Sequence, residues 1–159
     1  MTEIAFTLNS QAVQLKVEPR RTLVDVIREE CGATGTHIGC EHGVCGACTV
    51  LVDGMPARSC LMLAVACDDR QIHSFEGMRD DPIIAALRDS FHKRHAVQCG
   101  FCTPGMLISA RDLIQRGRAG TEAKIRSGLA GNLCRCTGYT NIVSAIAEAA
   151  ETLKAQGKA

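Results

Sequence analysis

Apolar residues near the start of the chain recur with a period of two, which indicates a β-hairpin with one buried face. The first strand carries them at Ile4, Phe6 and Leu8, and the second at 13, 15 and 17, with residues 9–11 between the strands. Thr22 and Asp25 then resemble a helix-capping pair, and apolar residues at 23, 26 and 27 predict a short helix ending near residue 30. Two more short strands are expected at 49–52, before a DG turn at 53–54, and at 71–73.

Beyond residue 81 the period becomes that of a helix. One helical face carries apolar residues at 83, 84, 87 and 91, and a second helix begins at Pro104 and runs to about residue 116. Thr121 opens a shorter helix marked by Ile125 and Leu129, and a last helix carries apolar residues at 142, 146, 149 and 153. Residues 74–81 are mostly polar, so we place a boundary there. The sequence predicts an α+β domain over 1–76 and an all-helical domain over 77–159.

Charge and composition exclude several classes of protein. Eighteen basic and seventeen acidic residues give a formal net charge of +1, which argues against a nucleic-acid-binding surface. Four Phe, one Tyr and no Trp offer few platforms for stacking bases. No apolar run approaches the roughly 20 residues of a membrane helix. With no signal peptide or twin-Arg leader recognisable, we expect a cytoplasmic protein.

Ten cysteines in 159 residues are the exceptional feature. Because the cytosol keeps thiols reduced, metal ligation is a better explanation for them than disulfides. Four follow the spacing C-x4-C-x2-C-x11-C, at Cys40, Cys45, Cys48 and Cys60. This is the plant-type [2Fe–2S] pattern, and glycines at 39, 43 and 46 let the loop approach a cluster closely. A zinc site is the alternative, but zinc ribbons favour two C-x2-C pairs.

The second group has the spacing C-x2-C-x31-C-x-C, at Cys99, Cys102, Cys134 and Cys136. Each pair precedes a predicted helix, whose N-terminus favours thiolates and an anionic cluster. Spacing alone leaves three alternatives open for this group: an iron–sulfur cluster, a zinc site, and redox thiols or disulfides.

Four longer motifs contain these cysteines: GTHIGC at 35–40, GVCGACTV at 43–50, QCGFCTPGM at 98–106 and GNLCRCTGY at 131–139. They resemble the small iron–sulfur subunit of the molybdenum hydroxylases, the family of xanthine oxidase and carbon monoxide dehydrogenase. The resemblance extends from Ile4 to about Leu153. It implies a plant-type ferredoxin-like (β-grasp) domain followed by a helical-bundle domain, each with one [2Fe–2S] cluster.

The resemblance also implies the role of the chain within a complex. A large subunit would carry molybdenum with a pterin cofactor, and a medium subunit would carry FAD. This chain would relay electrons from molybdenum to the flavin, with its helical-domain cluster next to the pterin. Gln98 and Cys136 would approach the pterin, and the complex would be a dimer of heterotrimers. No residue of this chain is expected to be catalytic, because the cofactors carry the chemistry.

Two other functions fit part of this pattern: a free-standing two-cluster ferredoxin and a zinc-stabilised interaction module. A Rieske centre, in which two His replace two Cys, is disfavoured because each group already supplies four cysteines. Cys31 and Cys67 are expected to pack as small hydrophobes. His37 and His42 are expected to lie at the surface or in hydrogen bonds. Arg135 either steers the cofactor of a partner or pairs with a local carboxylate.

Overall fold

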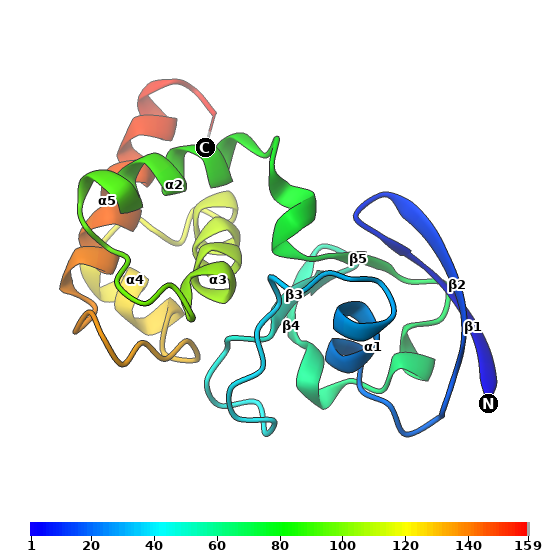
Figure 1. Ribbon diagram of the computed structural model, residues 1–159. Coiled ribbons are helices and arrows are strands. Elements are labelled where there is room, and N and C mark those ends of the chain that lie inside the picture. The colour runs from blue at the N-terminus through cyan, green and yellow to red at the C-terminus, as the bar shows by residue number, and fades with distance from the viewer. Residues whose placement is uncertain (159) are drawn as a thin grey trace.

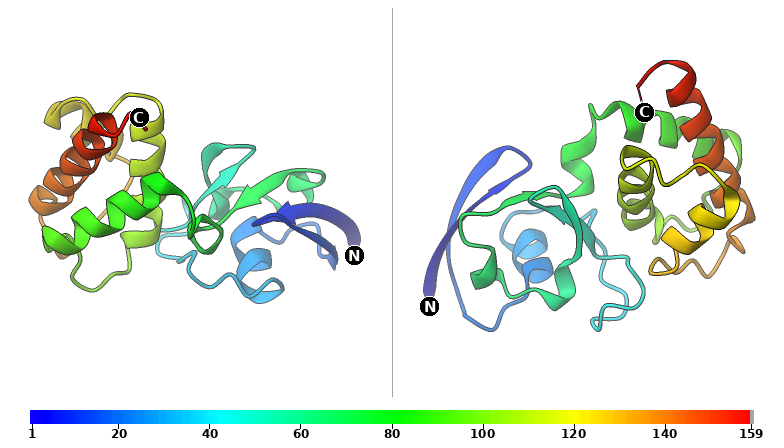
Figure 2. Two further views of the ribbon diagram at one scale, coloured as in Figure 1. Left: turned by 90° about the horizontal axis from the view of Figure 1, so that it is seen from above. Right: turned by 180° about the vertical axis from the view of Figure 1, so that it is seen from behind.

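The computed structural model describes residues 1–158, and the predicted helical domain therefore ends one residue outside the described part. Figure 1 shows two halves side by side, a β-sheet half that contains the N-terminus and a helical half that contains the C-terminus. The two further views in Figure 2 also show the halves side by side. The segments 40–48 and 131–139, which carry candidate ligand cysteines and are called the ligand loops below, lie at the junction between them. Among residues 1–158, no helix has the length and apolar character needed to cross a membrane.

The first half is a five-stranded mixed sheet with the strand order β2-β1-β5-β3-β4. The strands are β1 (Thr2–Leu8), β2 (Gln11–Val17), β3 (Thr49–Val52), β4 (Met55–Arg58) and β5 (Gln71–His73). The predicted hairpin is confirmed, but its turn is tighter than expected. Gln11 already pairs with Leu8, and only Asn9 and Ser10 turn the chain, both with positive φ.

Helix α1 (Leu23–Glu29) lies against this sheet, and Leu23, Val26 and Ile27 form one core with residues of β1, β3 and β5. Thr22 caps the helix, because its hydroxyl accepts a hydrogen bond from the Asp25 amide. Cys67 is fully buried in this core and Cys31 packs at its edge, as expected of small apolar side chains. The chain between α1 and β3 contains neither helix nor strand, as its glycine content predicts.

The second half packs four helices around its own core. These are α2 (Pro82–Lys93), α3 (Thr103–Gln115), α4 (Glu122–Gly128) and α5 (Thr140–Ala155). Helix α3 begins one residue before Pro104, which lies at its second position. The sequence predicts that residues 139–141 precede the last helix, but helix α5 begins at Thr140, so Asn141 lies inside it.

Strand β3 joins the two cores. Successive residues of a strand point to opposite faces, and here Val50 belongs to the sheet core whereas Leu51 belongs to the helical core. Met78, in the short 3-10 turn Phe75–Met78, also packs into the helical core. The halves therefore share an apolar joint, and the boundary after residue 76 stays a prediction.

Candidate cluster-binding sites

The structure brings the cysteines of the first group together in two pairs. Cys45 lies close enough to Cys40 to shift the pKa of the Cys40 thiol, and Cys48 likewise shifts the pKa of the Cys60 thiol. Cys48 and Cys60 are buried with Val24 in a small core of their own. A [2Fe–2S] cluster needs two thiolates on each iron, so two sulfur pairs match its donor set.

The loop backbone is directed at these sulfurs. The Cys45 N–H lies 3.4 Å from Cys40 Sγ, and backbone N–H groups of Cys45 and His42 lower the pKa of the Cys40 thiol to about 6. A Cβ at Gly39 would come within 3.0 Å of Cys45 Sγ, and one at Gly43 within 2.4 Å of Leu61 Cδ1. Gly39 thus leaves room at a sulfur and Gly43 leaves room for Leu61, and the donor set fits a cluster.

The second group forms two pairs in the same manner, although its members come from distant segments. Cys99 and Cys136 have their sulfurs 3.5 Å apart, and Cys102 contacts Cys134. Cys99 and Cys136 are exposed, whereas Cys102 and Cys134 pack against the helical core. All ten cysteines are free thiols, so the disulfide alternative for this group is not observed.

The location of Cys102 at the start of a helix is not enough to favour the thiolate form of this residue. This residue is the N-cap of α3, yet burial raises the pKa of its thiol to about 12, aided by the neighbouring Cys134. Burial likewise raises the pKa of Cys60 to about 11. Buried thiolates require a compensating positive charge, which iron supplies when a cluster is bound. Burial also opposes ionisation of Cys134, but hydrogen bonds from Thr137, Cys136 and Cys102 together outweigh it and lower the pKa.

Within residues 1–158, no three or more His, Cys, Asp or Glu side chains converge on a point suited to a single metal ion. The sulfurs are instead grouped as pairs. Tyr139, with positive φ, supports the second ligand loop, because its hydroxyl accepts a hydrogen bond from the Cys134 amide at 2.8 Å. This hydrogen bond gives Tyr139 a structural role.

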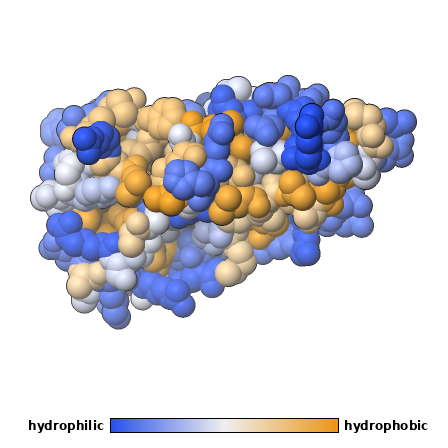
Figure 3. All heavy atoms as spheres, turned by 90° about the horizontal axis from the view of Figure 1, so that it is seen from below, coloured by the Kyte–Doolittle hydropathy of each residue, from blue (hydrophilic) through white to orange (hydrophobic). Residues whose placement is uncertain are grey.

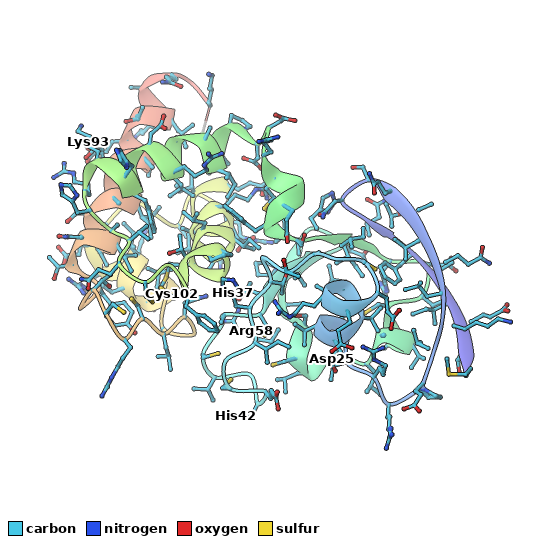
Figure 4. The ribbon with its side chains drawn as sticks, viewed as in Figure 1. Asp25, His37, His42, Arg58, Lys93 and Cys102 are labelled. Carbon is cyan, nitrogen blue, oxygen red and sulfur yellow. The ribbon has the colours of Figure 1, made fainter. Side chains whose placement is uncertain are left out.

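The two ligand loops touch each other across the junction. The Leu133 amide donates to the Cys45 carbonyl at 2.8 Å, and a Cβ at Gly105 would lie only 2.3 Å from the Gly46 carbonyl oxygen. The His37 ring stacks on that of Phe101 with the ring centroids 4.7 Å apart. His37 Nδ1 also forms a hydrogen bond with the Phe101 carbonyl. Figure 4 shows His37 and Cys102 on facing sides of this junction. The hydrophobic periodicity of the sequence did not predict these contacts between the two loops.

Apolar side chains are exposed beside the ligands. Val44, Leu61, Phe101 and Leu133 each neighbour a ligand cysteine in sequence and are about half or more exposed. Figure 3, seen from the side of the ligand loops, shows hydrophobic residues spread across both halves. Arg135 is exposed and forms no ion pair with any residue of the described chain, so the alternative that it pairs with a local carboxylate is not observed.

Comparison with known proteins decides the family. Residues 6–76 match the 2Fe-2S iron-sulfur cluster binding domain, and residues 74–147 match the [2Fe-2S] binding domain. The caffeine dehydrogenase subunit gamma of Pseudomonas sp. (strain CBB1) is 47% identical, over 94% of this chain and 91% of its own. The xanthine dehydrogenase iron-sulfur-binding subunit of Escherichia coli O157:H7 is 40% identical over 94% of each chain.

A solved structure, quinoline 2-oxidoreductase from Pseudomonas putida 86, contains a chain that superposes with a TM-score of 0.91 at 46% identity, covering 99% of this chain and 98% of that one. This chain is an iron–sulfur subunit of the molybdenum hydroxylase family. It is the electron-transfer subunit of a multi-subunit oxidoreductase with two [2Fe–2S] clusters. Larger partner subunits carry the molybdenum–pterin centre and FAD. The zinc-module and free-standing-ferredoxin alternatives are not supported.

Proposed function

We propose that Cys40, Cys45, Cys48 and Cys60 hold the first cluster of this subunit, and that the second is held by Cys99, Cys102, Cys134 and Cys136. The observation that carries this assignment is the division of each group into two sulfur pairs. Each bound cluster would accept and release one electron at a time, so a two-electron oxidation on the large subunit can leave in single steps.

We further propose that electrons enter at the second site and leave from the first. Gln98, Cys99 and Cys136 are all exposed at one edge of the helical half. This edge can approach a pterin, with the Gln98 amide available for a hydrogen bond and Cys136 serving as both ligand and contact. The first site has its own exposed apolar neighbours, Val44 and Leu61, for the subunit that carries FAD.

Iron and acid-labile sulfide analysis with EPR of the reduced protein tests the ligand assignment. About four iron atoms and four sulfides per chain, with two distinguishable signals, are expected. About two of each would leave one cysteine group without a cluster and overturn the two-site assignment.

The assembly is proposed to be a cytoplasmic dimer of heterotrimers. The exposed apolar side chains beside both ligand sites support two separate protein contacts for this subunit. The mass of the purified complex by light scattering tests the stoichiometry, and a mass equal to one heterotrimer would contradict it. Fractionation of the producing cells tests the compartment.

We propose a nitrogen heterocycle as the substrate class of the complex. The support is that the relatives above are named for caffeine and xanthine, and the solved structure for quinoline. Turnover with a panel of nitrogen heterocycles and aldehydes tests this proposal, which fails if the aldehydes alone are oxidised.

A further inference from the structure

Arg58 extends from the end of β4 to the chain segment that precedes Cys134. Its Nη1 donates to Thr49 Oγ1 at 2.6 Å, and its Nη2 donates to the Gly131 carbonyl at 2.7 Å. Thr49 directly follows Cys48, and Gly131 lies three residues before Cys134. Figure 4 places Arg58 between the two halves. One guanidinium therefore binds the ends of both ligand loops.

The Gly46 carbonyl lies at the centre of this network. It accepts hydrogen bonds from Thr49 Oγ1 at 2.5 Å and from Asn132 Nδ2 at 3.3 Å. Thr49 and Asn132 are almost fully buried. Because buried polar groups are costly to leave unpaired, a network with all its members bonded favours one arrangement of the loops.

The network stabilises the direct contact between the two loops. The Leu133 amide, which donates to the Cys45 carbonyl at 2.8 Å, follows Asn132 and precedes Cys134. This hydrogen bond joins the carbonyl of Cys45, a proposed ligand of the first cluster, to the residue that precedes Cys134, a proposed ligand of the second. Arg58 forms no ion pair with residues 1–158, so both of its bonded nitrogens serve the loops.

We propose that Arg58 is a positioning residue for electron transfer between the two clusters. It holds the 131–134 segment in register against the 45–49 loop and so fixes the separation and relative orientation of the two sites. This inference rests on the ligand assignment proposed above. The step moves one electron from the helical site to the ferredoxin-like site, so that one cluster is oxidised as the other is reduced and no bond forms or breaks.

The test uses the assembled complex with Arg58→Met and Arg58→Lys. Lysine keeps the positive charge but lacks the planar fork that reaches both loops, so it separates charge from geometry. The readouts are the spin–spin interaction between the two reduced clusters in EPR and the rate of electron equilibration between them after rapid one-electron reduction. Both variants should retain two cluster signals, with a weakened spin–spin interaction and a slower electron equilibration, because both quantities fall as the two clusters move apart.

Arg116→Met is the matched control. Arg116 also crosses between the halves, donating to Met55 Sδ at 2.9 Å, but it contacts neither ligand loop and should leave both readouts unchanged. Wild-type interaction and rate in Arg58→Met and Arg58→Lys would overturn the proposal. If Arg58→Met fails to retain its clusters, Arg58→Lys and Asn132→Ala decide the question by the same two readouts. Failure of the ligand assignment is recognised separately, because the unmodified complex would then lack one of the two signals.

Discussion

The two proposed cluster-binding sites each contain four thiols but are constructed in different ways. The first takes three cysteines from one loop and a fourth from the turn after β4, and buries Cys48 and Cys60 within its own half. The second joins two segments more than thirty residues apart and leaves Cys99 and Cys136 exposed. The first site therefore depends on the geometry of one loop. The second depends on the packing of the helical core and has exposed cysteines at an edge that a partner can contact.

The largest expected effect separates the two sites directly. Cys45→Ser should abolish the EPR signal of the first cluster and spare the second, and Cys136→Ser should do the reverse, because each variant removes a ligand from only one set. Iron analysis should show a loss of about two iron atoms per chain in each case. If both variants abolish the same signal, our assignment of ligands to clusters is wrong.

A glycine at the junction provides the next largest effect. Gly46 has φ +74°, and a Cβ there would come within 2.3 Å of the Gly131 carbonyl oxygen. Gly46→Ala should lower the free energy of unfolding by about 1–2 kcal/mol through its backbone conformation and by about 1–3 kcal/mol more through overpacking. Thermal or chemical unfolding measures the total.

Gly54→Ala is the control for this variant, since Gly54 has φ +78° but nothing within 4 Å of its missing Cβ. It should show the conformational cost alone and leave the interaction between the clusters intact. Equal losses of stability in the two variants would mean that contact between the loops contributes nothing at Gly46.

The sites should also differ in how their reduction potentials can be altered. At the first site a backbone N–H of Cys45 approaches Cys40 Sγ, and no substitution that keeps Cys45 as a ligand removes it. At the second, the Thr137 hydroxyl lies 3.1 Å from Cys134 Sγ. Hydrogen bonds to sulfur stabilise the reduced, more negative cluster. Thr137→Val should therefore lower the potential of the second cluster by roughly 40 mV, the equivalent of about 1 kcal/mol.

Redox titration followed by EPR measures both potentials in one sample. The first cluster should be unchanged in Thr137→Val and serves as the internal reference. An equal shift of both potentials would indicate a general rearrangement of the chain, and an unchanged second potential would show that the hydroxyl does not affect the cluster.

Sequence patterns predicted the elements of this fold well where the signal is local. Alternation located β1 and β2, the Thr22 cap located the start of α1, and the helical faces of α2 and α5 were correct. Boundaries that depend on a single backbone conformation were less accurate. The turn at Asn9 and Ser10 and the start of α5 after Tyr139 both rely on positive φ at non-glycine residues, which a hydrophobic pattern does not report.

The cysteine spacing identified the candidate ligands but could not predict which cysteines lie next to each other. Cys102 contacts Cys134 because α3 and the loop before α5 meet in the helical core. Arg58 and Gly131 are 73 residues apart in sequence, and neither belongs to a repeating pattern. The contact between Arg58 and Gly131 arises only when the two halves dock, so no local signal in either half predicts it.

The smallest expected effect concerns acid stability of the helical half. Glu148 on α5 bonds Lys93 and Arg94 at the end of α2, and these contacts lower the pKa of its carboxyl. A carboxyl with a depressed folded pKa contributes stability above its ordinary value of about 4.5 and loses it as the pH falls through the folded value. Glu148→Gln should therefore be slightly less stable at pH 7 and show a weaker pH dependence below about 4.5.

Denaturant unfolding followed by circular dichroism from neutral to acid pH measures this difference, which should be small because the cations are exposed. Asp53 provides the corresponding test in the sheet half. The pKa of its carboxyl is lowered by the Gln71 amide and by Arg70. Asp53→Asn should weaken the acid dependence in the same direction, through the sheet rather than the bundle. If Glu148→Gln retains the full acid dependence of the wild type, the bonds from Lys93 and Arg94 do not contribute to the stability of the α2–α5 contact.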